Sequence, residues 1–223
     1  MIKGIIFDLD DTLFDCTGQL TAPARLRAAE ILASTSDATT YYQQQETLSQ
    51  IHGSSEAIRK LGSQNNIPSD IVEKALAAYN SDEVEAITPF PDVSETLSKL
   101  AQRNYKLVLV TSGHPERQKK KVHLLGLQNY FNETDNTLFL HDDRKNADKG
   151  PHLQMAAEHL SLPYPEIIAV GDKLTAEITA GNVLGMTTVR MRHGRQKDRI
   201  PQTDTEYPDY EIDCISELLS LLP

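Results

Sequence analysis

The sequence predicts an α/β fold in which a doubly wound, parallel, Rossmann-like sheet carries an inserted all-helical domain. Short apolar runs alternate with helical patterns over most of the chain, and each run stops at a polar residue. Runs that are apolar throughout are typical of strands covered on both faces, as in a parallel sheet. The segment between Asp15 and about Thr88 breaks this alternation, because it contains helical patterns only and is too long for a crossover.

The apolar runs predict strands at residues 2–9, 106–110, 166–170 and 187–190, and more weakly at 137–140. Between and after them, apolar residues recur with helical spacing at residues 93–103, 115–125, 151–160, 175–184 and 215–222. Pro115 suits the first turn of its helix, and Gly126 suits the position after the end. Strands and helices in this order predict parallel strands joined by helical crossovers.

The inserted segment is expected to form helices at residues 22–33, 40–51, 55–61 and 69–79. Gly53, Gly62 and Pro68 are expected to mark the turns between them. Linkers are expected near residues 15–20 and 81–90. The predicted domains are therefore a Rossmann-like core of residues 1–15 and 88–223 and a helical domain of residues 16–87.

Net charge, cysteine content and the length of the apolar runs exclude several classes of protein. The 223 residues carry a formal net charge of −10, whereas a nucleic-acid partner normally requires a basic face. Cys16 and Cys214 form neither a disulfide framework nor a zinc-ligand spacing. No apolar run approaches the roughly 20 residues that span a bilayer, and the N-terminus lacks the apolar length of a signal peptide. We expect a cytoplasmic monomer or homodimer with no membrane or nucleic-acid partner.

Two carboxylates stand at the end of the first predicted strand. Asp8 and Asp10 are separated by one residue and point the same way in an extended chain. Their repulsion is relieved by a bound cation or a shared proton, and Mg²⁺ prefers carboxylate ligands of this kind. Asp172, at the end of another strand, could supply a further carboxylate. The alternative is that Asp8, Asp10 and Asp11 form a capped turn before the next helix.

Other strand ends carry groups suited to phosphate. Thr111, Ser112 and Gly113 precede a helix whose N-terminus favours an anion, although an ordinary helix cap has the same composition. Lys149 lies just before another helix and could serve as a point charge toward phosphate, or be a solvated loop lysine. The run of lysines at 119–121 is expected on a solvated helix face.

These residues together resemble the haloacid dehalogenase superfamily, in particular its phosphatases with a helical cap inserted between the first two motifs. Order and spacing agree from residue 2 to about 190. Lys149 departs from the usual Lys-Pro-x-Pro context, and Glu177 stands where the family more often has Asp. The motifs are Asp8-Leu9-Asp10-Asp11-Thr12, then Thr111, then Lys149-Gly150-Pro151-His152, then Gly171-Asp172 with Glu177.

The resemblance implies a magnesium-dependent phosphatase. Asp8 would attack phosphorus to form an aspartyl-phosphate, and Asp10 would act as acid and base. Magnesium would be held by Asp8, the backbone carbonyl of Asp10 and Asp172, with Glu177 acting behind them or through water. The phosphoryl oxygens would be held by Thr111, Ser112, Gly113 and Lys149. Dehalogenases of the superfamily lack an acid at the position of Asp10, so phosphate chemistry is favoured.

The helical cap is expected to supply substrate contacts, with His52, Gly53, Ser54 and Arg59 as candidates. The expected substrate is a small phosphorylated metabolite such as a sugar phosphate, a phosphoglycolate-like acid or a nucleoside monophosphate. A phosphomutase of the same superfamily is an alternative, although Ser55 stands where those enzymes carry a basic residue. A phosphate-binding regulatory protein without turnover is an alternative of another class.

Overall fold

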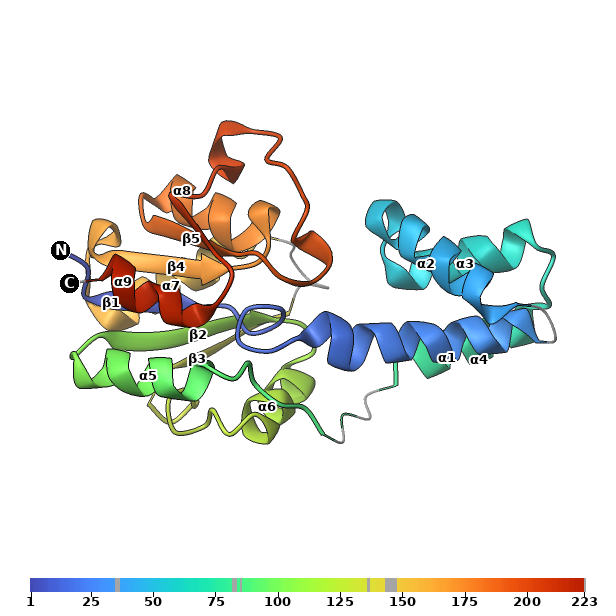
Figure 1. Ribbon diagram of the computed structural model, residues 1–223, viewed down its shortest axis with the longest axis horizontal. Coiled ribbons are helices and arrows are strands. Elements are labelled where there is room, and N and C mark those ends of the chain that lie inside the picture. The colour runs from blue at the N-terminus through green and yellow to red at the C-terminus, as the bar shows by residue number, and fades with distance from the viewer. Residues whose placement is uncertain (35–36, 82–83, 85, 136, 143–147, 223) are drawn as a thin grey trace. The chain divides into compact units, whose positions relative to one another are not determined.

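The computed structural model describes residues 1–34, 37–81, 84, 86–135, 137–142 and 148–222. The chain forms two compact units (Figure 1), one of Met1–Thr17 with Val84–Pro223 and one of Gly18–Glu83. Residues 82, 83 and 85 of the predicted return linker lie outside the described part. Within the described ranges, every helix falls short of the length and apolar character that crossing a bilayer requires.

The first unit contains a parallel six-stranded sheet in the order β3-β2-β1-β4-β5-β6, which confirms the predicted Rossmann-like α/β fold. β1 pairs with β2 on one side and with β4 on the other, so the first strand of the chain is central. The carboxyl ends of all the strands therefore meet at one edge. The strands are β1 (Gly4–Phe7), β2 (Lys106–Ser112), β3 (Leu138–His141), β4 (Ile167–Gly171), β5 (Thr187–Met191) and β6 (Tyr210–Ile212).

Helices cover both faces of this sheet (Figure 1). On one face, α7 and α8 pack on alternate strand residues, among them Ile6, Val108 and Ala169. Because successive residues of a strand point to opposite faces, the remaining apolar residues of each run face the other helices. The helices of this unit are α5 (Val93–Gln102), α6 (Pro115–Leu124), α7 (Gly150–Leu160), α8 (Thr179–Leu184) and α9 (Leu218–Leu221).

The edge strand β6 is absent from the prediction. It pairs with β5 from Tyr210 to Ile212, but only Ile212 is buried. A short edge strand with two exposed residues has no apolar run to reveal it. The predicted helix at 175–184 also differs, since a π-helical turn at Leu174–Ile178 precedes α8. The final helix at 215–222 begins as a 3₁₀ turn before α9.

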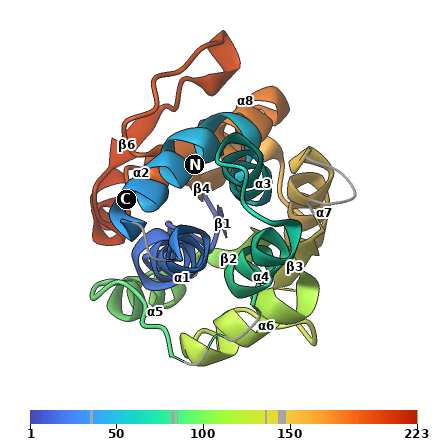
Figure 2. The same ribbon diagram turned by 90° about the vertical axis from the view of Figure 1, so that its right-hand side faces the viewer.

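The second unit consists of helices α1 (Ala22–Ala33), α2 (Ala38–His52), α3 (Ser54–Gln64) and α4 (Ser69–Tyr79). α1 and α4 lie side by side (Figures 1 and 2), and residues such as Ala28, Ile58 and Leu76 form a common apolar core. That this unit acts as a cap stays a prediction.

The predicted turn at Gly62 is wrong. α3 continues through it to Gln64, and Gly62 is buried. A Cβ at this position would lie 2.4 Å from Cγ2 of Val72, so the glycine is required by the close approach of α3 and α4. Gly53 does mark a turn, with a φ of 78° at the end of α2.

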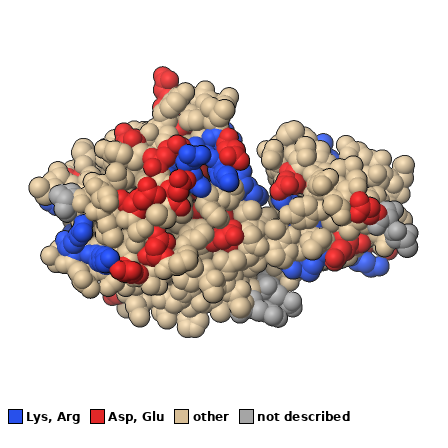
Figure 3. Space-filling view, viewed as in Figure 1, with Lys and Arg blue, Asp and Glu red and all other residues tan. Residues whose placement is uncertain are grey.

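Acidic and basic side chains are both spread over the surface seen in Figure 3. The net charge of −10 therefore does not form one acidic face there.

Candidate active site

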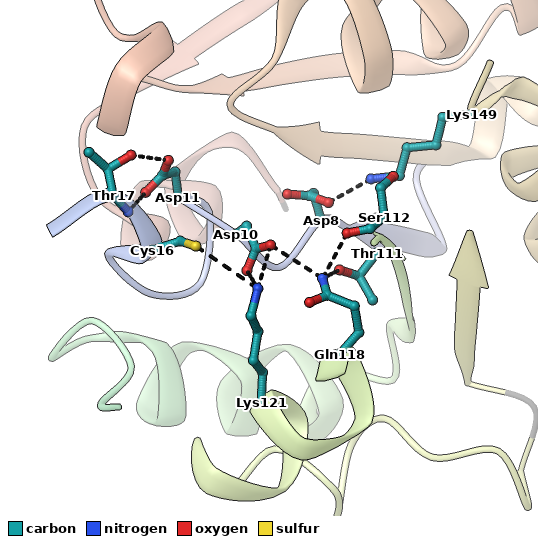
Figure 4. Close-up of polar contacts among 10 residues, drawn as sticks. All are labelled: Asp8, Asp10, Asp11, Cys16, Thr17, Thr111, Ser112, Gln118, Lys121 and Lys149. Carbon is teal, nitrogen blue, oxygen red and sulfur yellow. Dashed lines mark hydrogen bonds and ion pairs between the residues drawn. The ribbon is translucent and has the colours of Figure 1, made fainter. Parts of the chain in front are cut away.

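Asp8 follows β1 directly and lies at the carboxyl edge of the sheet. Its amide donates to the carbonyl of Val170 at 2.8 Å, which extends the β1–β4 pairing by one residue. Oδ1 of Asp8 lies 2.6 Å from Nζ of Lys149 (Figure 4). The side chain of Asp8 is 7% exposed and that of Lys149 is fully buried, so this ion pair is shielded from water.

Lys149 is placed by the start of α7, where it is the residue before the first helical turn. Its ammonium also lies 2.5 Å from Oε1 of Glu177, so one cation links two buried carboxylates. The interpretation of Lys149 as a solvated loop lysine is wrong. Burial would lower the pKa of Lys149, but the charges of Asp8 and Glu177 outweigh it and raise the pKa above its ordinary value.

The acids at this edge carry raised pKa values. Burial, with the charges of Glu177 and Asp10 added and that of Lys149 opposing, raises the pKa of Asp8 to about 7. Burial and the neighbouring Glu177 and Asp8 likewise raise the pKa of Asp172 well above its usual value. Raised values of this kind mark carboxylates gathered in a poorly hydrated place.

Glu177 reaches this place because Gly171 leaves room for it. A Cβ on Gly171 would lie 2.5 Å from Cγ of Glu177, which is closer than side chains pack. The π-helical turn at Leu174–Ile178 carries Glu177 across the end of β4. Its Oε1 binds Lys149, whereas its Oε2 is buried without a hydrogen-bond partner among the described residues.

These carboxylates fit a divalent cation. The charges of Asp8, Asp172 and Glu177 act on one another, and Lys149 forms ion pairs with Asp8 and Glu177. Unbalanced buried charge of this kind is relieved by a hard cation with oxygen ligands. The predicted set of Asp8, Asp10 and Asp172 offers the oxygen ligands that Mg²⁺ prefers, and the binding itself stays a prediction.

Among the described residues, a different group of two acids and a histidine meets the spacing of a metal site. Oxygen or nitrogen atoms of Asp11, Asp15 and His193 lie within 4.8 Å of one another. However, Asp11 accepts hydrogen bonds from the amide and the hydroxyl of Thr17 at 2.7 and 2.6 Å, and His193 lies 3.2 Å from Asp15. These contacts favour a structural role, in which the three side chains join the loop after β1 to the segment after β5.

The predicted phosphate loop ends β2 beside Asp8. Thr111 is buried, and its hydroxyl oxygen accepts a hydrogen bond from Nε2 of Gln118 at 2.5 Å. The hydroxyl of Ser112 lies 3.0 Å from Nδ1 of His141, at the end of β3. Gly113 has a φ of 137° and donates its amide to the carbonyl of His141 at 2.9 Å. The loop is therefore held by Gln118 of α6 and by His141 of β3.

Asp10 is bound from α6 by two side chains that the sequence interpretation did not select. Nζ of Lys121 lies 2.8 Å from each carboxylate oxygen of Asp10, and Nε2 of Gln118 lies 3.2 Å from Oδ2 (Figure 4). The solvated-face interpretation is therefore wrong for Lys121, which is buried. A signal was present, because Gln118 and Lys121 share a helical stripe with the apolar residues Val122 and Leu125.

The cap candidates belong to the second unit. His52 ends α2, Gly53 follows it, and Ser54 begins α3. His52 and Arg59 are exposed, and Ser54 is partly buried. Their contact with a substrate stays a prediction.

Comparison with known proteins bears on the identity of this site. The family model for haloacid dehalogenase-like hydrolases matches residues 2–185, which include Asp8, Lys149 and Asp172. The chain belongs to this family. A glyceraldehyde 3-phosphate phosphatase of Methanopyrus kandleri is 32% identical over all of this chain and 97% of its own length.

A second curated relative is also a phosphatase by name, and a solved structure shares the fold. A pyrophosphatase of Halalkalibacterium halodurans is 27% identical over 99% of this chain and 97% of its own. A crystal structure described as a predicted phosphoglycolate phosphatase from Haemophilus somnus superposes with a TM-score of 0.73 at 18% identity, over 100% of this chain and 98% of that one. The prediction of an enzyme of the haloacid dehalogenase-like family, of its phosphatase type, is confirmed.

Proposed function

We propose that this haloacid dehalogenase-like phosphatase is a magnesium-dependent phosphomonoesterase that works through an aspartyl-phosphate on Asp8. The observation that carries the proposal is the ion pair between Asp8 and the buried Lys149, at 2.6 Å. A carboxylate nucleophile has to be ionised, and burial alone opposes this. Lys149 offsets part of the effect of burial and leaves the pKa of Asp8 at about 7, so Asp8 ionises near neutral pH.

In the first step, Asp8 attacks phosphorus, the bond to the leaving oxygen breaks, and Asp10 gives that oxygen a proton. In the second step, Asp10 takes a proton from water, the water oxygen attacks the aspartyl-phosphate, and Asp8 is released with inorganic phosphate. One group serves as acid and then as base, so both protons are accounted for. The exposed fraction of the Asp10 side chain, 31%, suits a group that meets the leaving alcohol and water.

The phosphoryl group would be held at the strand ends. Lys149 supplies a positive charge, while Thr111 and Ser112 supply a hydroxyl and a backbone amide close to the start of α6. Asp8, Asp172 and the carbonyl of Asp10 would hold Mg²⁺, with Glu177 behind them. When bound, the cation offsets the charge that gathers on the phosphoryl oxygens.

The proposed substrate is a small phosphorylated metabolite, with glyceraldehyde 3-phosphate as the first candidate. Support comes from the relative of that name, which is 32% identical over the whole chain. A phosphoglycolate-like acid, a sugar phosphate, a nucleoside monophosphate and pyrophosphate belong in the same test. The cap residues His52, Gly53, Ser54 and Arg59 are proposed to contact the part of the substrate beyond the phosphate.

The test is a panel of these compounds with and without magnesium, with phosphate release and isomer formation both measured. We expect phosphate release that requires magnesium and is fastest for one small ester. Isomer formation without net phosphate release would favour the phosphomutase alternative. The absence of turnover on every compound in the presence of magnesium would contradict the proposal.

A further inference from the structure

Two side chains of α6 bind the Asp10 carboxylate from one side. Nζ of Lys121 lies 2.8 Å from both Oδ1 and Oδ2, and Nε2 of Gln118 lies 3.2 Å from Oδ2. Gln118 and Lys121 are three residues apart in a helix, so they project from the same face. Figure 4 shows both side chains pointing from α6 toward Asp10.

Gln118 also binds the phosphate loop. Its Nε2 lies 2.5 Å from the hydroxyl oxygen of Thr111 and 2.9 Å from the carbonyl of Ser112. A side-chain amide nitrogen has two hydrogens, so these three acceptors share two donors. The position of Asp10 is therefore coupled to that of Thr111 through a single amide.

The two partners of the Lys121–Asp10 ion pair differ in their exposure to solvent. The side chain of Lys121 is 5% exposed and that of Asp10 is 31% exposed. Nζ of Lys121 also lies 5.8 Å from the ring centroid of Phe14. Lys121 is thus enclosed beneath Asp10, and a ligand at the strand ends would meet the carboxylate and not the ammonium.

The Lys121–Asp10 ion pair is expected to add little to the stability of the folded protein. The desolvation penalty of a buried ion pair commonly cancels most of its attraction, whereas its geometry restricts the orientation of both groups. A carboxylate bound through both oxygens by one ammonium has little freedom to rotate. The adjacent Lys119 and Lys120 reach solvent or other acids, so only Lys121 of the three is placed for this contact.

We propose that Gln118 and Lys121 are positioning residues. They hold the Asp10 carboxylate toward the leaving oxygen and fix its position relative to Thr111. The proposal rests on the proposed function, because it takes Asp10 as the group that protonates the leaving oxygen. Neither positioning residue gains or loses a proton in the reaction. Their effect should appear in both chemical steps, of which only the first depends on the leaving group, and little in substrate binding.

The experiment compares two aryl esters. p-Nitrophenyl phosphate has a leaving group that departs with little help from an acid, whereas phenyl phosphate has a more basic one. In Lys121→Met we expect kcat/KM, which reports the step in which the leaving group departs, to fall about ten- to a hundredfold further for phenyl phosphate than for p-nitrophenyl phosphate. Lys121→Arg should recover much of the loss. Lys120→Met, an exposed neighbour on the same helix, is the matched control and should behave as the wild type.

Gln118→Leu should show the same dependence on the leaving group and, in addition, a raised KM, because Thr111 loses its donor. Equal losses on the two esters in Lys121→Met, or no difference between Lys121→Met and Lys120→Met, would overturn the proposal. If Lys121→Met does not fold by circular dichroism, Lys121→Arg and Lys121→Gln decide by the same comparison. Failure of the proposed function is distinguishable, since the wild type would then hydrolyse neither ester or Asp8→Asn would keep full activity.

Discussion

Nζ of Lys149 lies 2.6 Å from Oδ1 of Asp8 and 2.5 Å from Oε1 of Glu177, and the lysine side chain is fully buried. One ammonium therefore compensates two carboxylates, one after the end of β1 and one in the π-helical turn at Leu174–Ile178. Removal of this cation would leave both acids buried and unpaired, which is far less favourable than the loss of a surface ion pair.

We predict that Lys149→Met destabilises the protein by about 3–5 kcal/mol, the usual cost of breaking a buried pair. The double variant Lys149→Met/Glu177→Gln should recover part of that stability, because one unpaired acid is removed. It should recover no activity, because the phosphoryl group has still lost its lysine. Urea unfolding and p-nitrophenyl phosphate turnover measure the two effects. A single variant as stable as the wild type would show that the pair is not buried in solution.

The carboxylates at the sheet edge predict a pH-dependent stability in the absence of metal. The folded-state pKa values of Asp8 (about 7) and Asp172 lie above the unfolded value of 3.8. Their contribution is therefore fully present below the unfolded pKa and is lost as pH rises through the folded values. With a chelator present, we expect the Tm to decrease from about pH 4 to pH 7, and magnesium to raise the Tm most at the upper end.

The variant Asp172→Asn tests how much one of these acids contributes to the pH dependence of the Tm. It removes an acid whose ionised form is disfavoured by burial, Glu177 and Asp8, so the metal-free Tm at neutral pH should increase. The rise in Tm on adding magnesium should become smaller. A wild-type Tm that is independent of both pH and magnesium, measured by differential scanning fluorimetry, would contradict the assignment of this edge as a cation site.

His152 predicts a pH effect of the opposite sign. Burial, together with the nearby His141 and Lys149, lowers the pKa of His152 below its ordinary 6.5. The neutral ring is favoured in the folded protein, so its contribution is present above pH 6.5 and is lost as pH falls through the lower folded value. With magnesium present, His152→Asn should lose less stability than the wild type on going to lower pH. Identical pH profiles of Tm would contradict this account.

Gly62 predicts a packing effect in the helical unit. A Cβ at this position would lie 2.4 Å from Cγ2 of Val72, so Gly62→Ala should destabilise by about 1–3 kcal/mol despite the better helix propensity of alanine. Gly62→Ala combined with Val72→Ala should lack the clash, and Val72→Ala alone is its reference. Thermal unfolding of the three variants measures the coupling. Additive effects would show that the two helices do not meet at this point.

The sequence predicted those parts of the site that depend on strand ends. Asp8, Thr111 and Asp172 each follow a buried apolar run, and parallel strands bring such positions to one edge. The position of Lys149 before a helix left two interpretations open, and Glu177 was assigned only by the resemblance, because the contacts of both depend on how α7 and the π-helical turn pack. Neither their ion pair nor the space that Gly171 provides is visible in composition or periodicity.

What sequence reasoning missed depends on tertiary contact. Lys121 stands among three lysines, and only packing shows that one of them is turned toward Asp10. Gly62 looks like a helix end because glycine is a poor helix former, but the neighbouring helix requires it. β6 lacks an apolar run because it is a short edge strand. In each case a partner distant in sequence outweighed the local preference.

The most direct test of the central claim is to locate the phosphoryl group during turnover. The enzyme is mixed with p-nitrophenyl phosphate and magnesium, quenched in acid, digested and analysed by mass spectrometry. We predict phosphate on Asp8, more of it in Asp10→Asn because hydrolysis of the intermediate is slowed, and none in Asp8→Asn, which should also be inactive. Phosphate on another residue, or turnover by Asp8→Asn at the wild-type rate, would contradict the account.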